Sequence, residues 1–393
     1  MKTFQGLDFY DLDGLLTEEE KLIRKTVREF VEKEVLPIIE EYNEKAKFPS
    51  QLIPKMAELG LLGAQLKGYG CAGLGANAYG IIMQELERGD SGLRSFVSVQ
   101  GALVMYPILT FGSDEQKEKW LPLLQQGKAI GCFGLTEPDF GSYPSGMRTN
   151  AKKEGNSYIL NGTKMWITNG SVADISVIWA KTDEGSQTQG IRGFLVEKGT
   201  AGLKTSDIKG KISLRASVTS EISLTDVKIP VKNLLPKTEG LKSALMCLNQ
   251  ARYGISWGAI GAAMACYHSA LEYSKERIQF EKPIASFQLV QQKLAWMVQE
   301  ITKAQFLAWR LGKLKDEGKL KPHQVSLAKK NNVWMALETA RMARDMLGAN
   351  GTAYEYHVGR HMCNLEAVKT YEGTHDIHTL IVGEAVTGIP AYR

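Results

Sequence analysis

The first third of the chain alternates apolar and polar residues with the period of an α-helix. Thr17-Glu-Glu-Glu20 is typical of a capping box, in which the Thr17 side chain caps a helix that Glu20 reinforces. Apolar residues then recur at helical spacing from Leu22 to Leu36. These patterns predict an N-terminal helical domain over residues 1–130. Further helices are expected in it over residues 55–62, 78–88, 100–111 and, capped by Asp114, 115–124.

At about residue 131 the pattern changes to short runs of β-branched and aromatic residues separated by turns. Such runs are typical of β-strands, and the Asn-Gly pairs at 161–162 and 169–170 predict hairpin turns. We expect a central antiparallel β domain over residues 131–237. Its predicted strands cover residues 157–162, 164–170, 174–182, 193–199 and 221–230.

Helical periodicity returns in the last part of the chain, in long amphipathic segments over residues 258–280, 288–318 and 325–348. Small residues in the first of these permit close helix packing. Helices of this length predict a C-terminal four-helix-bundle domain over residues 238–393 that packs against other subunits. The predicted fold class is therefore α+β, mainly α, in three domains.

Composition narrows the function classes. With 44% hydrophobic residues, the 393-residue chain can form two or three domains with large cores. Its net charge of +5 is spread along the chain, which argues against a nucleic-acid partner. No run of about 18 apolar residues predicts a membrane span, and the acidic N-terminus is unlike a signal or transit peptide. The five cysteines form no CxxC pair, so we expect free thiols in a reducing compartment.

The segment Gly68–Gly73 matches the dinucleotide-binding pattern G-x-G-x-x-G, with Asp90 about 20 residues further on. That pattern needs a preceding strand and a βαβ unit, and neither surrounds it here. The favoured interpretation is a glycine-rich loop between helices.

Two segments of the predicted β domain have the chemistry of a cofactor wall: Phe133–Pro138 with Ser142, and Trp166–Asn169. Hydroxyl and backbone N–H groups suit a polar heterocycle, and an aromatic ring can cover its face. The alternative is a strand pair with a core tryptophan.

The segment Thr370–His378 contains a glutamate, Glu372, beside a glycine and apolar residues. Closure of such a site removes water, which raises the pKa of a carboxylate and makes it a stronger base. His375 and His378 can share a helix face. Because they form no H-E-x-x-H pair and no third ligand is indicated, we expect helix-surface or packing histidines rather than a metal site.

Taken together, these blocks resemble the acyl-CoA dehydrogenase family of flavoproteins over essentially the whole chain. The most specific motifs are Leu135-Thr-Glu-Pro138 with its preceding glycine, Trp166–Asn169, Arg277–Phe280, Leu347–Gly351 and Tyr371–Thr374. Within the family, the resemblance is to the glutaryl-CoA dehydrogenases. That narrower resemblance is carried by residues 67–73, 87–95, 213–217 and 371–378.

The resemblance implies roles for individual residues. Glu372 matches the catalytic base, Arg252 a contact to the CoA portion, and Tyr371 and Ser142 substrate contacts. The implied wall around the flavin ring consists of Phe133, Leu135, Thr136, Ser142, Trp166 and Thr168, with Thr374 and Asp376 just past the base. The adenosine half of FAD is implied to meet Arg277, Phe280, Gln288, Asp345 and Gly348 of a neighbouring subunit.

The resemblance also implies that Arg94, Glu87 and Ser95 form a polar network for the distal carboxylate of the substrate. A guanidinium can bind a carboxylate bidentately. The alternative is a surface ion pair of Arg94 with Asp90 or Glu87.

Some positions depart from the family pattern. Ala349 replaces a glycine and Asp345 an expected glutamine, which weakens the implied adenosine contacts. Tyr143 stands where an aspartate is usual and could alter the entrance for the CoA chain.

The implied activity is FAD-dependent oxidative decarboxylation of glutaryl-CoA to crotonyl-CoA and CO2, in lysine and tryptophan degradation. Electron-transfer flavoprotein is the implied acceptor, in a homotetramer located in the bacterial cytoplasm or, in a eukaryote, the mitochondrial matrix. Alternatives on the same fold are a non-decarboxylating glutaryl-CoA dehydrogenase and a dehydrogenase or oxidase for another short-chain acyl-CoA. A further alternative, a non-catalytic assembly protein, is disfavoured by the presence of Glu372.

Overall fold

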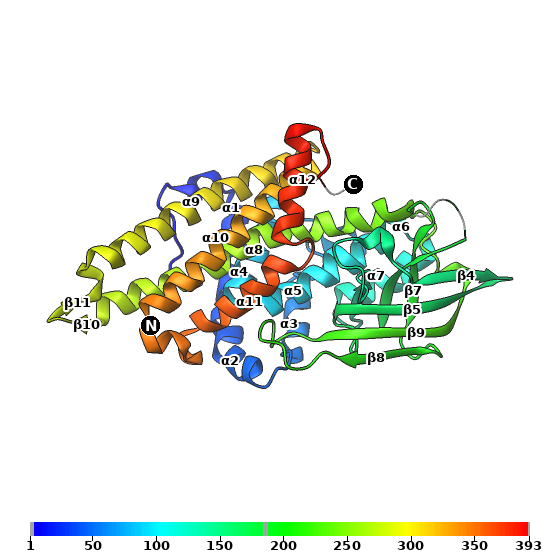
Figure 1. Cartoon of the computed structure of the whole chain (residues 1–393), viewed down its shortest axis with the longest axis horizontal. Helices are drawn as coiled ribbons and strands as arrows, with labels where there is room; N and C mark the ends of the chain where they lie inside the picture. The colour runs from blue at the N-terminus through cyan, green and yellow to red at the C-terminus, as the bar shows by residue number, and fades with distance from the viewer. Residues whose placement is uncertain (1–3, 184, 186–187, 392–393) are drawn as a thin grey trace.

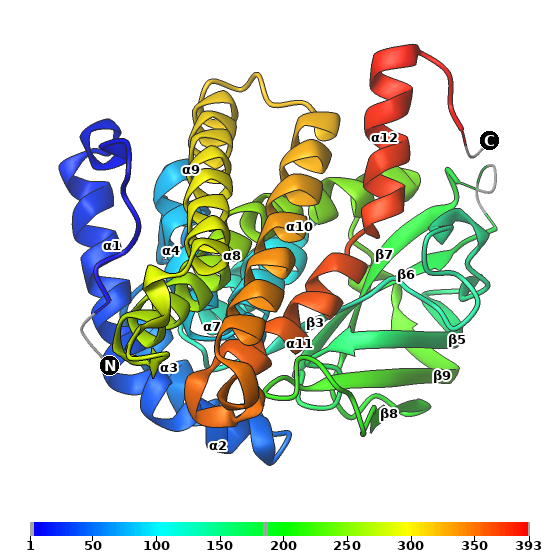
Figure 2. The same ribbon diagram turned by 60° about the vertical axis from the view of Figure 1, so that its left-hand side comes forward.

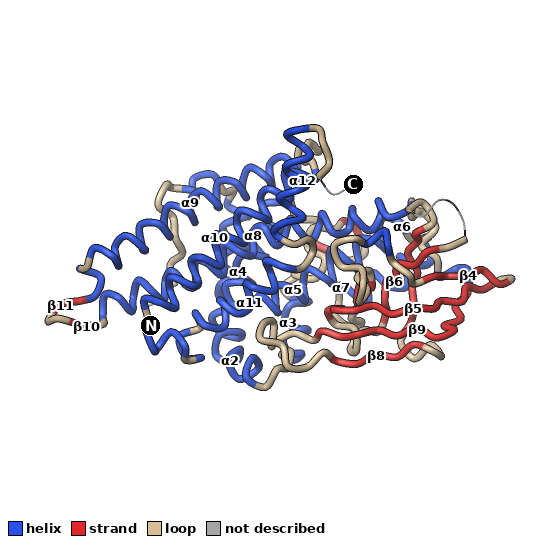
Figure 3. Tube along the Cα trace, in the orientation of Figure 1, coloured by secondary structure: helices blue, strands red, loops and turns tan. Residues whose placement is uncertain are grey.

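The computed structural model describes residues 4–183, 185 and 188–391. Helices from both ends of the chain form one side of the molecule, and the strands of the middle segment form the other (Figures 1 and 3). This arrangement confirms the predicted fold class, with a central β domain between two helical segments. The exact domain boundaries stay a prediction.

The N-terminal segment is helical, as predicted. Thr17 caps α1 and forms the expected capping box with Glu20. The last helix of the segment is capped by Ser113 rather than by Asp114, which is its first residue. The helices are α1 (Glu18–Phe30), α2 (Leu36–Glu44), α3 (Ile53–Glu58), α4 (Ala76–Gly89), α5 (Ser91–Ser98), α6 (Tyr106–Phe111) and α7 (Asp114–Gln125).

Two π-helical segments, Val31–Val35 and Val99–Met105, interrupt these helices. The second joins α5 to α6, so that Ser91–Phe111 forms one helical rod. In the described part of the chain this rod alone has the length and apolar composition of a membrane span. Since 89% of its apolar 18-residue stretch is buried inside the fold, the rod also has the features of a core helix.

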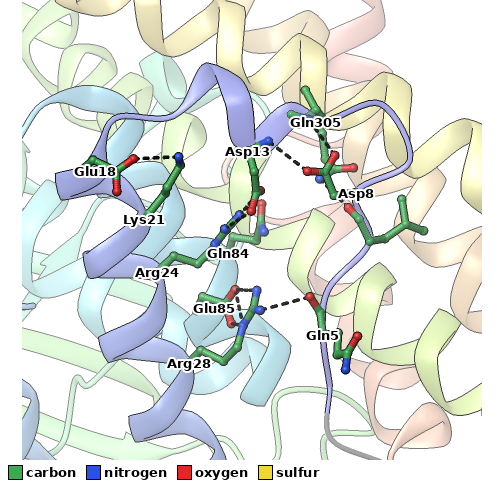
Figure 4. Close-up of polar contacts among 12 residues, drawn as sticks. Gln5, Asp8, Asp13, Glu18, Lys21, Arg24, Arg28, Gln84, Glu85 and Gln305 are labelled. Atoms are coloured by element: carbon green, nitrogen blue, oxygen red, sulfur yellow. Dashed lines mark hydrogen bonds and ion pairs between the residues drawn. The ribbon is translucent and has the colours of Figure 1, made fainter.

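Polar contacts tie residues 5–13 to α1, to α4 and, through Gln305, to α9 (Gln288–Asp316) (Figure 4). Arg24 forms a bidentate pair with Asp13, and Arg28 bonds both the Gln5 carbonyl and Glu85. Glu85 lies on α4, a helix whose residues are all buried. The N-terminal segment therefore helps to fix the helix that also carries Glu87.

The glycine-rich segment at 68–73 is a short hairpin of β1 (Lys67–Gly68) and β2 (Cys71–Ala72) between helices. Asp90, the acid of the dinucleotide alternative, instead caps α5 through Gly92 N and pairs with Arg360 at 2.6 Å. The interpretation as a loop between helices is consistent with this placement.

The middle segment is a seven-stranded sheet in the order β3-β6-β4-β5-β9-β8, and β7, which is not in this order, also pairs with β6. The sheet is mixed: β3 and β4 run parallel to β6, which corrects the prediction of an antiparallel domain, while the other strand pairs are antiparallel as predicted. The strands are β3 (Gly131–Gly134), β4 (Asn150–Glu154), β5 (Ser157–Thr168), β6 (Ile175–Lys181), β7 (Ile191–Glu197), β8 (Leu203–Asp207) and β9 (Thr219–Pro230).

The two predicted Asn-Gly hairpins are also wrong. Asn161-Gly162 lies inside β5, where a register shift against β9 absorbs it as a bulge, so residues 157–168 form one strand. Asn169-Gly170 does turn the chain at the end of β5. The strands that it joins, β5 and β6, are not partners, because β4 lies between them.

The C-terminal helices pack around α8, which is the longest of them (Figure 2). α4 packs along α8 on one side and α10 on the other, and all three contribute to one hydrophobic core. The two helical segments therefore fold around shared apolar residues. The helices are α8 (Gly240–Glu276), α9 (Gln288–Asp316), α10 (Pro322–Met346), α11 (Val358–Thr370) and α12 (His375–Thr387).

The predicted helix over residues 258–280 ends earlier than expected. α8 stops at Glu276, and Arg277–Phe280 belongs to a hairpin of β10 (Ile278–Gln279) and β11 (Lys282–Pro283). Phe280 and Glu281 adopt left-handed backbone conformations that a helix cannot contain. The hairpin projects from the end of the molecule opposite the sheet (Figure 1).

Candidate active site

The short loop between α11 and α12 carries the predicted base. Glu372 has a φ of 52° and Gly373 a φ of 94°, so two successive residues adopt left-handed backbone. This conformation is uncommon for a residue with a side chain and persists where surrounding contacts enforce it. Glu372 is thus presented by a strained turn rather than by a regular helix.

The carboxyl group of Glu372 lies in a dry environment. The residue as a whole is partly exposed, but its Oε2 atom is buried and forms no hydrogen bond with any residue that the structure describes. Burial raises the pKa of Glu372 because the carboxylate loses hydration, while nearby Arg94, Arg252 and Lys329 act in the opposite direction. A carboxylate with a raised pKa is suited to remove a weakly acidic proton.

Arg94 lies at the centre of a buried polar cluster beside this loop. On α5, its Nε donates to Glu87 Oε2 of α4 at 2.6 Å, and its Nη2 donates to the hydroxyl of Tyr371. Arg94 and Glu87 are both 0% exposed, so the alternative of a surface ion pair is wrong. Ser95 is buried next to Arg94 on the same helix.

A glycine on α8 makes room for this ion pair. A Cβ atom at Gly258 would lie 2.0 Å from Glu87 Oε2 and 3.2 Å from Arg94 Nε. The backbone of α8 therefore packs directly against the Glu87–Arg94 pair, which no side chain at this position would allow.

The pair is not fully satisfied by the protein. Arg94 Nη1 and Glu87 Oε1 are buried, and neither has a hydrogen-bond partner within residues 4–183, 185 and 188–391. An unmet hydrogen bond of a buried charged group costs more than about 1–3 kcal/mol. A buried guanidinium nitrogen without a partner is what a site completed by an anionic ligand would contain.

Two cationic side chains from other helices hold the loop. Arg252 of α8 donates from Nε to the Glu372 carbonyl oxygen at 2.7 Å, so the residue expected to meet CoA also contacts the base's backbone. Lys329 of α10 donates to the carbonyl oxygens of Tyr371 at 2.9 Å and Gly373 at 2.7 Å. Sequence reasoning missed Lys329, because a lysine on an amphipathic helix is usually solvated and only its burial reveals the contact.

The two segments expected to surround a flavin ring lie side by side, although the side chains of Phe133 and Leu135 are buried in a hydrophobic core. Phe133 lies on β3, with Leu135 and Thr136 directly after it, while Trp166 and Thr168 end β5. Met165 N donates to the Thr136 carbonyl oxygen at 2.9 Å, which ties the two segments together. Trp166 is 58% exposed and has a φ of 63°, so the alternative of a core tryptophan is wrong.

A buried ion pair that the sequence did not reveal binds the wall segment that contains Leu135. Lys164 Nζ donates to Glu137 Oε1 at 2.9 Å and to the Leu135 carbonyl oxygen at 3.1 Å. Burial lowers the pKa of Lys164 to about 8, while the Glu137 carboxylate opposes that shift. Glu137 in turn accepts the backbone N–H groups of Arg148 and Thr149. The loop that carries Ser142 is anchored by these bonds.

That loop is open to solvent. Ser142 is exposed, and Tyr143 is 61% exposed with its ring 6.3 Å from that of Phe140. The departure at Tyr143 thus places an aromatic ring at the surface beside Ser142.

The start of α12 holds the remaining residues just past the base. Thr374 caps this helix through its Oγ1, which accepts from Ile377 N at 3.1 Å, and Asp376 is exposed in the first turn. His378 is buried below the loop, where burial lowers its pKa to about 3, whereas the side chain of His375 is only partly exposed. Within the described residues, no group of three or more His, Cys, Asp or Glu side chains could hold a metal ion.

The residues implied for the adenosine half of FAD lie apart from these groups. Phe280 lies in the turn of the exposed β10–β11 hairpin, at the end of the molecule opposite the sheet, while Arg277 precedes β10 and Gln288 is the first residue of α9 (Figure 1). Asp345 is exposed near the end of α10 and pairs with Lys293, and Gly348 follows that helix. One chain therefore does not bring the two predicted halves of a flavin site together.

Comparison with known proteins places this geometry in a family. Models of three protein-family domains match almost the whole chain: the N-terminal domain of acyl-CoA dehydrogenase at residues 17–128, its middle domain at 132–227 and its C-terminal domain at 238–387. The chain belongs to the acyl-CoA dehydrogenase family. The resemblance stated from the motifs is confirmed, and family membership makes the protein an oxidoreductase.

Solved acyl-CoA dehydrogenase structures resemble the chain over its full length. A glutaryl-CoA dehydrogenase from Mycobacterium smegmatis is 55% identical, with 97% of this chain and 98% of that chain covered and a TM-score of 0.95. A glutaryl-CoA dehydrogenase from the same organism in complex with FADH2 is 51% identical, with 100% of both chains covered and a TM-score of 0.97. The mitochondrial short-chain specific acyl-CoA dehydrogenase of Rattus norvegicus is 37% identical over 93% of this chain and 90% of that protein.

Proposed function

We propose that the protein oxidises glutaryl-CoA with FAD as cofactor and releases CO2 to give crotonyl-CoA. The observation that carries the choice of a dicarboxylic substrate is the buried Arg94 Nη1, which lacks a partner among the described residues, in a cluster that includes the Tyr371–Glu372 loop. Similarity to two glutaryl-CoA dehydrogenases at 51–55% identity supports the same choice.

In the proposed reaction, Glu372 removes the α-proton of the thioester. Its raised pKa and unpartnered Oε2 suit that role. Arg94 binds the distal carboxylate and so fixes which carbon faces the base, which is the positioning that catalysis requires. The backbone N–H of Glu372 is the donor that the family resemblance implies for the thioester carbonyl, and one such donor contributes roughly 3–4 kcal/mol.

FAD supplies the acceptor for the hydride that leaves the β-carbon. The exposed ring of Trp166 and the part-exposed side chains of Thr136 and Thr168 fit a flat polar heterocycle at the edge of the sheet. Oxidation creates a double bond next to the carbon that bears the distal carboxylate. When CO2 departs, the electron pair of the broken C–C bond is delocalised toward the thioester. The proton held on Glu372 can then be delivered to the carbon that carried the distal carboxylate.

A plain short-chain acyl-CoA dehydrogenase is the second candidate, favoured by the 37% identity to the short-chain enzyme of Rattus norvegicus. An aliphatic acyl tail would leave the Arg94 nitrogen without a partner in a buried site, which is costly. Dicarboxylate binding is therefore the better match to the site.

The deciding experiment is anaerobic incubation of the holoenzyme with glutaryl-CoA and an artificial electron acceptor, followed by identification of the CoA product. Crotonyl-CoA with one equivalent of CO2 is expected. Glutaconyl-CoA without CO2 would identify a non-decarboxylating dehydrogenase. Turnover of butyryl-CoA in the absence of glutaryl-CoA turnover would refute the dicarboxylate assignment.

We further propose electron-transfer flavoprotein as the physiological acceptor, and a location in the bacterial cytoplasm or the mitochondrial matrix. Both follow from the family resemblance. A reduced enzyme that passes electrons to electron-transfer flavoprotein faster than to molecular oxygen is the expected result, and the reverse preference would indicate an oxidase.

We expect the protein to bind about one non-covalent FAD per chain in a homotetramer. The reason is that Arg277 and Phe280 lie on a projecting hairpin far from the wall at the sheet edge, so a second chain must supply the adenosine contacts. Arg277→Glu should lower FAD occupancy and tetramer content together, as measured by the flavin-to-protein absorbance ratio and analytical ultracentrifugation. A stable monomer with full FAD occupancy would contradict the shared site.

A further inference from the structure

Three successive backbone carbonyl groups at the Glu372 turn are all bound by cationic side chains. Lys329 Nζ bonds the carbonyl oxygens of Tyr371 and Gly373, and Arg252 Nε bonds the one between them. Both cations are buried, with Lys329 at 1% and Arg252 at 8% exposed. The turn is therefore gripped by donors from α10 and α8, two helices remote from it in sequence.

These three hydrogen bonds stabilise a strained backbone conformation. Glu372 has a side chain and a left-handed backbone, which is strained and persists only where surrounding contacts over-determine it, whereas Gly373 adopts its positive φ without that strain. Lys329 spans the turn, because its two acceptors lie on the residues before and after Glu372. Releasing either acceptor would free the peptide units that set the direction of the Glu372 side chain.

Burying a lysine this way has a cost that packing alone does not explain. Burial lowers the pKa of Lys329 to about 7, with the Glu372 carboxylate opposing that shift and the cations Arg252 and Arg94 adding to it. Two of its ammonium hydrogens are used by the loop. An apolar side chain would fill the space without desolvation, so the lysine's value lies in what it bonds.

We propose that Lys329 is a positioning residue for the reaction: its two carbonyl bonds hold the Glu372 turn in the left-handed conformation from which the carboxylate reaches the substrate. This inference rests on the proposed role of Glu372 as base. Lys329 acts through the backbone of the turn, and the proposal requires no contact between Lys329 and the substrate.

The test is Lys329→Met in the holoenzyme, with Lys315→Met as the matched control. Lys315 is a second largely buried lysine, with a pKa lowered by burial to about 8, but it bonds Gln250 rather than the turn. Lys329→Met should lower kcat for glutaryl-CoA about 100-fold, because misplacement by about 1 Å can cost that much. The Kd for crotonyl-CoA should change less than about threefold. Amide hydrogen exchange over residues 371–374 should quicken in Lys329→Met and not in Lys315→Met.

Lys329→Gln keeps hydrogen-bond donors without the positive charge and provides a second test in case Lys329→Met fails to fold. Lys329→Gln should retain part of the protection of residues 371–374 and a kcat between those of the wild type and Lys329→Met. Wild-type kcat and wild-type exchange in both Lys329 variants would overturn the proposal. So would Lys329→Gln with a wild-type kcat and an unprotected turn, which is the deciding result if Lys329→Met fails to fold.

The two readouts separate this inference from the proposed function. Should Glu372→Gln keep full turnover, the assignment of the base fails. Faster exchange in Lys329→Met without loss of kcat would show that Lys329 holds the turn but that the turn has no part in the reaction. That result would also overturn the positioning role of Lys329.

Discussion

Replacing Glu372 by glutamine is expected to lower turnover of glutaryl-CoA by about 10²–10⁴-fold or more. FAD content and substrate binding should stay close to those of the wild type. The amide keeps the shape of the side chain and cannot accept the α-proton, and loss of a positioned base typically costs a factor of this size. Single-turnover bleaching of the flavin absorbance by glutaryl-CoA isolates the step. Near-normal bleaching in the variant would remove Glu372 from the role of base.

The pH dependence supplies a second check on the same residue. The base must be deprotonated, so kcat/KM should fall as pH falls through the pKa of Glu372, which burial raises above its ordinary value. The matched control is Glu366→Gln on α11, because the Glu366 side chain is paired with Arg341 at the surface. That variant should keep both the wild-type turnover and the acid limb.

Replacing Arg94 by alanine is expected to reduce kcat/KM for glutaryl-CoA much more than for pentanoyl-CoA, its five-carbon monocarboxylic counterpart. Only glutaryl-CoA loses a charge-assisted contact and must leave a carboxylate in a partly dry pocket. Breaking such a buried pair costs roughly 2–5 kcal/mol, so the ratio of the two kcat/KM values should fall by about 30-fold or more. The relative rate with pentanoyl-CoA should hold or rise.

The ratio is informative because general damage to the fold affects both substrates alike. Arg88→Ala is the matched control, since Arg88 is also buried and paired with a glutamate of α4, Glu85, but lies outside the Tyr371–Glu372 cluster. It should lower both rates, if at all, by the same factor. An equal loss for both substrates in Arg94→Ala would make Arg94 structural and remove the main support for a dicarboxylic substrate.

The sequence alone determined the sequence of helical, β and helical segments, because the period of apolar residues changes from 3.6 to 2 and back again. It also singled out Glu372, Arg94 and the two segments of the wall, since a resemblance carried by motifs identifies residues one by one. It failed at β5, where an Asn-Gly pair became a bulge inside one long strand. Turn propensity is local, whereas strand continuity was decided by the pairing with β9.

What only the tertiary structure decided is how the charges of the site are arranged. Nothing along the chain brings Lys329 to residues 371 and 373, or Arg252 to the carbonyl between them, because these contacts join helices about 40 and 120 residues away in sequence. Burial, which depends on all the surrounding elements at once, raises the pKa of Glu372 and leaves Arg94 Nη1 without a partner in the described chain. The sequence names the reacting groups, while their desolvation and orientation are properties of the packed helices, since solvent exclusion and long-range contacts have no local pattern.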